Sequence, residues 1–219
     1  MKRLSEKGFT IVELMIATAV LSTILVMVSI IMISIGTLYY KGVNQSQVQD
    51  NVRSISDEIA QQLELNDQFK TGSLTVGSTT VESYCMGATR YSYVIGVQLG
   101  TIPDVLWRDI DTAGNCQPQN VTVTGLSGGT ELIAPHSRLT NLTISQPNPS
   151  DPYSVTVGVA YGDDDLLCSP SLAGSCNSPV TMPIADFQNG DLLCKGLPGQ
   201  QFCGTSILTT TVVQRISGS

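Results

Sequence analysis

The pattern of hydrophobic and polar residues divides the chain into three stretches, and the first is almost wholly apolar. Residues 9–35 form a run of 27 residues with a single ionisable side chain, Glu13. A helix of only about 20 residues crosses a hydrocarbon core. The run contains no proline, and Tyr39, Tyr40 and Lys41 follow it with the character of an aromatic belt and a cationic anchor. The first stretch therefore predicts a membrane-spanning helix.

The second stretch, residues 36–70, has the period of an amphipathic helix. Its apolar residues recur at spacings of four, three, four and four, and they form one stripe: Val48, Val52, Ile55, Ile59 and Leu63. Polar residues occupy the opposite face: Gln49, Asp50, Arg53, Asp57, Glu58 and Gln61. Since no proline interrupts the segment, we expect one helix from about Thr10 to Leu65. The apolar stripe has to be buried against another element, and we expect the rest of the chain to bury it.

The third stretch, residues 71–219, has the alternation of β-strands. The clearest segments are rich in Val, Ile, Thr and Tyr and are separated by Gly, Pro and Asn: residues 91–99, 119–125, 138–145, 153–162 and 205–217. No helical period appears between them, so an antiparallel sheet is expected. A long helix on an antiparallel sheet makes an α+β roll. Val212, Val213 and Ile216 predict a last strand that fixes the C-terminal end.

All six cysteines lie in this third stretch: Cys85, Cys116, Cys168, Cys176, Cys194 and Cys203. An even number in a Gly- and Pro-rich region predicts three disulfides in an oxidising compartment. A zinc site is disfavoured because no CxxC pair is present. Asp-Leu-Leu-Cys occurs twice, each time with a second cysteine soon after it. This echo favours two small loops, Cys168–Cys176 and Cys194–Cys203, and leaves Cys85–Cys116, although six cysteines allow about fifteen pairings and the others stay open.

The two small loops fall within residues 163–204, where the strand pattern is interrupted. We expect this region to be a surface excursion suited to contact with a partner. Its deletion is then expected to leave a folded, secreted protein with altered assembly or adhesion.

Charge gives the orientation of the expected span. Lys2, Arg3 and Lys7 outweigh Glu6 before the apolar run, so this end should stay cytoplasmic and the cysteines should face outward. The net charge is −7 with 13% charged residues, which argues against nucleic acid as the primary partner. Two plainer interpretations stay open: a secretory signal peptide cut near "ATA", residues 17–19, and a simple uncleaved anchor.

The stretch "KGFTIVELMIA" resembles the cleavage and methylation signal of type IV prepilins and pseudopilins. The resemblance covers about 30 residues: a short basic leader ends in Gly8, Phe9 follows, Glu13 is the fifth residue after that junction, and an unbroken apolar run continues. It implies that a membrane-embedded aspartyl prepilin peptidase cleaves between Gly8 and Phe9 and methylates the new amine of Phe9. It also implies a pilin-like roll, the α+β fold that the strand alternation predicts.

Glu13 gains a physical account from this resemblance. A carboxylate in a bilayer costs several kcal/mol, roughly 2.5 to 3.5 near a helix centre for Asp on insertion scales. Cleavage would create a positive amine on Phe9, and Glu13 of one subunit could pair with the Phe9 amine of its neighbour. Within an apolar bundle such a pair sets axial register more than it adds net stability. The plain alternative is an interfacial Glu13 that reaches toward water.

The expected organisation has four parts: a leader, residues 1–8; a transmembrane and assembly half-helix, residues 9–35; an amphipathic half-helix, residues 36–70; and an extracytoplasmic β-rich domain, residues 71–219. The expected function is a structural subunit of a type IV pilus or pseudopilus. It would reside first in the cytoplasmic membrane and then in a cell-surface pilus or a periplasmic pseudopilus. The implied partners are other pilin or pseudopilin subunits, the prepilin peptidase, assembly-platform proteins and the membrane.

A minor subunit is favoured over a major one, because elaborate loops would crowd a dense lattice. The "LWRDID" segment, residues 106–111, is also similar to the larger minor pseudopilins. The alternative function is a single-span, membrane-anchored extracellular binding or adhesion module that never polymerises. An anchored enzyme is the third possibility.

Catalytic and metal-binding signals are weak in this sequence. The single histidine, His136, has no nucleophile motif beside it, and GxSxG and phosphate-loop motifs are absent, so no enzyme is predicted. The acidic run Asp163, Asp164 and Asp165 is a calcium candidate, and residues 108–115 are a weaker one. No other cofactor is expected. Asn120 and Asn141 begin glycosylation-like triplets in expected strands.

Overall fold

The computed structural model describes residues 9–122, 128–148, 151–170, 175–177, 192–196 and 199–215. The chain divides into two compact units, Met1–Tyr40 and Lys41–Ser219. The division follows Tyr40, whereas the sequence pattern divided the helix after residue 35. Gly8 and the rest of the expected leader lie outside the described residues.

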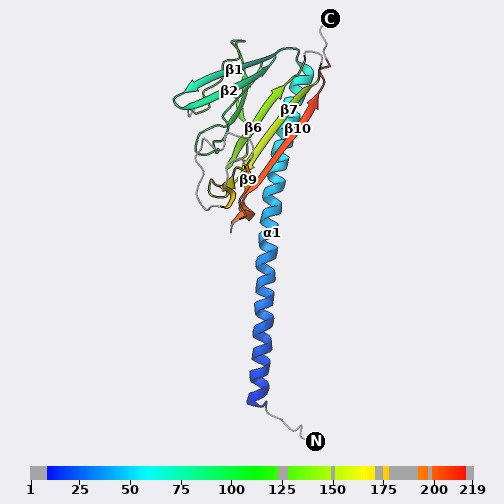
Figure 1. Cartoon of the computed structure of the whole chain (residues 1–219), viewed down its shortest axis with the longest axis vertical. Coiled ribbons are helices and arrows are strands. Elements are labelled where there is room, and N and C mark those ends of the chain that lie inside the picture. The colour runs from blue at the N-terminus through cyan, green and yellow to red at the C-terminus, as the bar shows by residue number, and fades with distance from the viewer. Residues whose placement is uncertain are drawn as a thin grey trace. The chain divides into compact units, whose positions relative to one another are not determined.

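Helix α1 runs from Ile11 to Leu65 without interruption, as the sequence predicts (Figure 1). It ends where Asn66 turns back on it, since the backbone N–H and the side-chain Nδ2 of Asn66 both donate to the carbonyl oxygen of Gln62, at 3.1 and 2.8 Å. These bonds satisfy one of the carbonyls that a helix C-terminus leaves open. The five residues of the predicted stripe are all buried.

The strands of the described residues form two antiparallel sheets and a short ribbon, whereas the sequence predicted one antiparallel sheet. The first sheet has the order β1-β2-β3-β4-β5, with β1 at Phe69–Val76, β2 at Thr79–Met86, β3 at Thr89–Tyr93, β4 at Leu106–Ile110 and β5 at Thr130–Glu131. The second has the order β10-β7-β6, with β6 at Ser137–Ser145, β7 at Tyr153–Tyr161 and β10 at Gly204–Val212. Strands β8, Leu167–Cys168, and β9, Leu193–Cys194, pair as the ribbon. The 3₁₀ turns η1, Ser175–Asn177, and η3, Gln200–Phe202, complete the described elements.

The main core joins the amphipathic half of α1 to both sheets. The stripe belongs to one hydrophobic cluster with Tyr91 of β3, Leu106 of β4, Val157 of β7 and Val212 of β10, among others. Figure 1 shows β7 and β10 running beside this part of α1. Glu58, expected on the polar face, is half-buried because it accepts hydrogen bonds from the Tyr91 hydroxyl at 3.0 Å and Arg108 Nη1 at 2.8 Å. The expected α+β class, a long helix packed on antiparallel strands, is confirmed.

Three strand predictions need correction. Strand β3 ends at Tyr93 instead of 99, since Gly96 adopts a φ of 83° and its N–H bonds to Leu139 of the other sheet. Residues 119–122 form a turn instead of a strand, with the Asn120 side chain accepting from Thr122; residues 123–125 lie outside the described part. Strand β10 ends at Val212, so Val213 lies beyond it, and residues 216–217 are not described.

Three disulfides are present, and they join Cys85 to Cys116, Cys168 to Cys176 and Cys194 to Cys203. This is the pairing that the sequence echo favoured. The described part of residues 163–204 has a small core of its own, in which Leu167, Cys168, Leu192 and Cys203 are buried together with Ala160 of β7. The expectation that deletion of residues 163–204 leaves a folded protein stays a prediction.

Candidate functional site at the amino end of the helix

The start of α1 is built by a reciprocal pair of hydrogen bonds between Thr10 and Glu13. Glu13 Oε2 accepts from the Thr10 backbone N–H and from the Thr10 hydroxyl, both at 2.9 Å. The Glu13 backbone N–H approaches Thr10 Oγ1 at 3.3 Å. This is a capping box, in which the N-cap side chain and the third helical residue satisfy each other's open N–H groups. The carboxylate therefore already has a role within its own chain.

Glu13 was a predicted site residue, but its partner Thr10 was not. The spacing Thr-x-x-Glu just before an apolar run is a helix-start signal that was visible in the sequence. The helix begins at Ile11, directly after Thr10, which agrees with that signal. Phe9, the expected site of methylation, precedes the helix with 86% of its surface exposed.

The part of α1 in the Met1–Tyr40 unit exposes its apolar surface on every side. Twenty large apolar side chains between Ile11 and Tyr40 are exposed, from 43% at Val28 to 79% at Ile11. Burying one such side chain is worth about 1.5–3 kcal/mol, so this surface needs an apolar environment. By length and composition, α1 is the one helix among the described residues that could cross a membrane.

The hydroxyl groups along this apolar surface are bonded within the helix. Six side chains donate to a carbonyl oxygen three or four residues earlier, at 2.8–3.0 Å: Thr18, Ser22, Thr23, Ser29, Ser34 and Thr37. Hydroxyls without a partner are costly in hydrocarbon. These bonds make the polar residues of the run compatible with an apolar surrounding.

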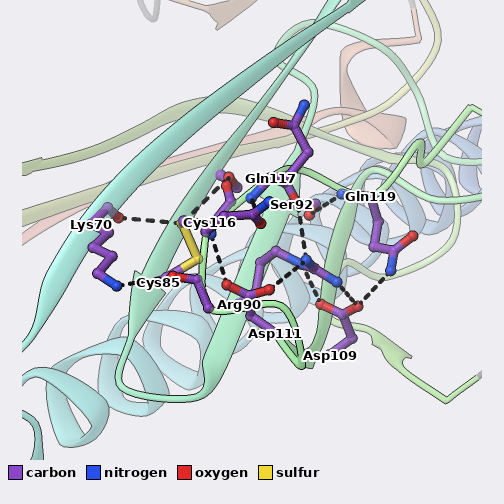
Figure 2. A network of polar contacts seen from close by, with 12 residues as sticks. Lys70, Cys85, Arg90, Ser92, Asp109, Asp111, Cys116, Gln117 and Gln119 are labelled. Atoms are coloured by element: carbon purple, nitrogen blue, oxygen red, sulfur yellow. Dashed lines mark hydrogen bonds and ion pairs between the residues drawn. A yellow bond between two sulfur atoms is a disulfide. The ribbon is translucent and has the colours of Figure 1, made fainter.

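A second polar site lies within the sheet unit, around Arg90 of β3 (Figure 2). The Arg90 guanidinium pairs with the carboxylates of Asp109 and Asp111, and its Nη1 also donates to the Gln117 carbonyl oxygen at 2.8 Å. Asp109 further accepts from Gln119 Nε2 at 3.0 Å. All three ionic side chains are at most 7% exposed, so their charges are weakly screened and depend on one another.

This cluster holds the Cys85–Cys116 disulfide in place. Asp111 Oδ2 accepts from the Cys116 N–H, and the Ser83 hydroxyl donates to the Cys116 carbonyl, both at 2.7 Å. Cys116 adopts a left-handed φ of 55°, and a β-carbon at Gly72 would lie only 2.0 Å from its carbonyl oxygen. Arg90, Asp109 and Asp111 all bond to residues of the irregular segment that follows β4 or to each other. These contacts indicate that the cluster has a structural role.

Of the remaining candidates from the sequence, His136 and Asp163 line one cavity, and no metal site forms among the described residues. Among the described residues, no group of three or more His, Cys, Asp or Glu side chains is placed to hold a metal ion. Asp164 of the acidic run instead pairs with the buried Arg138, so calcium at Asp163, Asp164 and Asp165 stays a prediction without structural support. His136 lines a cavity of about 210 Å³ with Tyr161 and Phe202, among others.

Comparison with known proteins gives one match, at the amino end. Residues 3–29 match the family model described as "Prokaryotic N-terminal methylation motif". That range contains the capping box and much of the exposed apolar run. No curated protein and no solved structure matches the chain.

Proposed function

We propose that this member of the type IV prepilin and pseudopilin family, identified by its amino-terminal motif, is a structural subunit of a pilus or pseudopilus. The observation that carries the proposal is the coincidence of the motif at residues 3–29 with a helix that exposes apolar side chains on every side. A membrane can cover that surface before assembly, and the same surface of other subunits can cover it afterwards. The subunit polymerises through this part of α1.

Processing by a prepilin peptidase between Gly8 and Phe9 is the first step of this function. Cleavage leaves a positive amine on Phe9, one residue before the N-cap Thr10. A helix N-terminus carries a partial positive charge, so a cation there is unfavourable unless a carboxylate is near. Glu13, in the first turn, supplies that carboxylate.

Glu13 can serve its own helix and a neighbouring subunit at the same time. Both bonds from Thr10 are accepted by Oε2, and a carboxylate has a second oxygen with its own acceptor sites. We assign Oε1 to the Phe9 amine of the adjacent subunit. In an apolar helical bundle this contact fixes which axial position the incoming subunit occupies.

The mass of the mature amino terminus tests the processing step. Intact-mass and peptide analysis of the protein from cells should find a chain that starts at N-methylated Phe9. A chain that retains Met1 in the membrane would contradict both processing and assembly, and would favour a tethered binding module that does not polymerise.

Two substitutions separate the charge of Glu13 from its capping role. Glu13→Gln keeps a side-chain acceptor for Thr10 but removes the charge, so the variant should enter the membrane and fail to join filaments. Thr10→Ala removes the cap but keeps the charge, and should still assemble. Incorporation of Glu13→Gln at the parental level, measured by quantifying the protein in sheared filaments, would refute the pairing.

A minor position in the filament is the finer part of the proposal. The disulfide-closed segments around β8 and β9 add a second small core to the sheet unit, and this bulk fits a low-copy subunit better than a dense lattice. The partners are then pilin or pseudopilin subunits, the prepilin peptidase and assembly-platform proteins. Quantitative mass spectrometry of purified filaments should find this chain far below the main subunit, and equal or greater abundance would contradict it.

A further inference from the structure

The core-facing side of the first sheet changes from apolar to polar along strand β2. Met86 lies in the main core and Tyr84 packs against it. Side chains alternate along a strand, so Glu82 and Thr80 point to the same side as these two residues. Both are exposed, whereas Val81, on the opposite side, is buried in a separate cluster. Figure 1 shows the hairpin of β1 and β2 diverging from β6, and this side of β2 continues beyond the core as an open polar surface.

Hydroxyl side chains surround the Glu82 carboxylate on this side of the sheet. Directly opposite Glu82 lie Ser73 on β1 and Tyr93 on β3, and in the next row Thr75 lies opposite Thr80. Directly opposite residues of antiparallel strands share one side of the sheet. Within the described part of the chain, no Lys, Arg or His side chain forms an ion pair with Glu82. The carboxylate therefore carries its charge among neutral groups.

The Tyr93 hydroxyl holds one oxygen of this carboxylate in place. It donates to Glu82 Oε2 at 2.8 Å and lies 3.4 Å from the Leu142 carbonyl oxygen, and Tyr93 is only 1% exposed. Its ring packs against that of Tyr84, with the centroids 5.3 Å apart. Burial raises the pKa of Tyr93, and hydrogen bonding with Tyr84 adds to the rise, so the phenol stays a donor. Tyr93 bonds to Oε2, which leaves the acceptor sites of Glu82 Oε1 for a ligand.

Glu82 and Tyr93 line a cavity of about 280 Å³ together with Ser78, Thr80 and Ile95. The lining offers one carboxylate, several hydroxyl oxygens, one aromatic ring and one aliphatic side chain. An alkylammonium group matches this set, because its three N–H donors require acceptors and its methylene stem can pack on apolar surface. A cation beside an aromatic ring gains a further attraction. An anion would be repelled by the carboxylate, and a neutral ligand would leave its charge without a counter-charge.

We propose that this cavity binds an alkylammonium group, of the kind that a lysine side chain or a free diamine carries. The nitrogen bonds to Glu82 Oε1 and to the hydroxyls of Ser78 and Thr80, and the carbon chain lies against Ile95. Tyr93 acts as a positioning residue that fixes the carboxylate. All lining residues belong to the Lys41–Ser219 unit. The inference is therefore independent of the membrane and filament contacts in the proposed function.

A methyl NMR titration of the full-length, oxidised chain in detergent micelles tests this binding. The isoleucine methyl groups are labelled with ¹³C, so that Ile95 reports on the cavity and Ile207, an exposed residue of the second sheet, reports on unspecific effects. The charged probe is Nα-acetyl-lysine methylamide. The matched neutral probe is Nα,Nε-diacetyl-lysine methylamide, and cadaverine represents the free diamines. The charged probe should shift the Ile95 signal to saturation and leave the Ile207 signal in place, whereas the neutral probe should shift neither.

Three variants locate the binding at the carboxylate. Glu82→Gln should weaken the binding of the charged probe about tenfold or more, because a hydrogen bond to a charged group is lost. Tyr93→Phe keeps the ring and should weaken it about fivefold, with the Ile207 signal unchanged. Asp57→Asn, at an exposed position of α1, is the control and should bind as the parent does.

The titrations also decide against the proposal or between its two sources. Equal shifts of Ile95 by the charged and neutral probes, parental affinity of Glu82→Gln, or no saturable shift with either amine would each overturn it. Tighter binding of the lysine derivative than of cadaverine supports a lysine side chain of a partner protein as the ligand. Tighter binding of cadaverine supports a free diamine.

Discussion

The two halves of α1 belong to one continuous helix but differ in where their apolar side chains lie and in what can bury them. Between Val48 and Leu63 the large apolar residues follow a single stripe that is buried with both sheets. Between Ile11 and Tyr40 the apolar residues cover every side and are exposed. The first pattern needs a partner on one face, which the chain itself supplies. The second needs an apolar surrounding on all faces, which has to come from outside the chain.

Polar groups show the same contrast. In the apolar half, hydroxyls bond to carbonyls three or four residues earlier. In the amphipathic half, Ser56, Asn51 and Asn44 bond to β10, to the segment after β5 and to η3. Local bonds make a helix independent of its neighbours, whereas distant bonds specify one arrangement. The polar contacts of the apolar half of α1 thus require no particular neighbour, whereas those of the amphipathic half require β10, η3 and the segment after β5.

The largest expected effect comes from the buried charges of the sheet unit. Arg90→Met leaves Asp109 and Asp111 buried without their cation, which should cost about 3–5 kcal/mol of unfolding free energy. Arg53→Met, at an exposed position of the helix, is the control and should have little effect. Urea unfolding in detergent, followed by Trp107 fluorescence, measures both; equal stabilities would show that the cluster is not an anchor.

Alanine substitutions at three leucines of α1 compare how much its buried and exposed surfaces contribute to the unfolding free energy. Leu63→Ala, at a fully buried position, should lower the unfolding free energy of the sheet unit by about 2–5 kcal/mol. Leu65→Ala, two residues away and half-exposed, and Leu25→Ala, in the apolar half, should change it little. A loss with Leu25→Ala as large as with Leu63→Ala would break the contrast between the two halves.

A smaller effect is expected for the hydroxyl that joins α1 to β10. Ser56 is buried and its Oγ lies 3.0 Å from Thr210 Oγ1, so Ser56→Ala should cost about 1 kcal/mol. Ser54→Ala, on the exposed side, is the control. In the background of Thr210→Val the cost of Ser56→Ala should shrink, and an unchanged cost in this double-mutant cycle would exclude the bond as its cause.

The smallest expected effect is a pH dependence of the unfolding free energy of the sheet unit. Burial raises the pKa of Glu131, and the charge of Asp104 adds to the rise, although the N–H groups of Ile133, Val105 and Leu106 oppose it. The folded state then binds the proton more tightly than the unfolded state. Stability should fall as the pH rises from the unfolded pKa of this carboxyl through its folded pKa. Glu131→Gln should reduce that slope in urea unfolding at several mildly acidic pH values; parallel slopes would contradict it.

The local sequence pattern was sufficient to predict the helix but not the strands of the two sheets. The stripe from Val48 to Leu63 predicted the buried face of α1 residue by residue, because helical periodicity is a local property. Strand β4 was missed because Arg108 and Asp109 look solvated in sequence. Asp109 is in fact buried against Arg90 of the neighbouring strand, a contact that no local pattern reveals.

The same limit applies to the candidate sites. Glu13 stood out as a lone charge in an apolar run, and its partner Thr10 was readable from the capping-box spacing. The turn at residues 119–122 resembled a strand because Val121 is apolar, yet Val121 is buried in a separate cluster that also contains Trp107. The attachment of η3 to Asn44 joins residues 157 positions apart and had no signal in the sequence.

The place of strand β10 in the chain determines when the sheet unit can close during synthesis. The strand pairs with β7 and supplies the partner of Ser56, while Gln214 and Arg215 beyond it bond to Asn66 and to the Glu64 carbonyl at the end of α1. The helix is translated before this strand. A nascent chain therefore keeps part of the stripe of α1 uncovered until residues 204–215 have been made, and we expect the sheet unit to resist proteases only after that point.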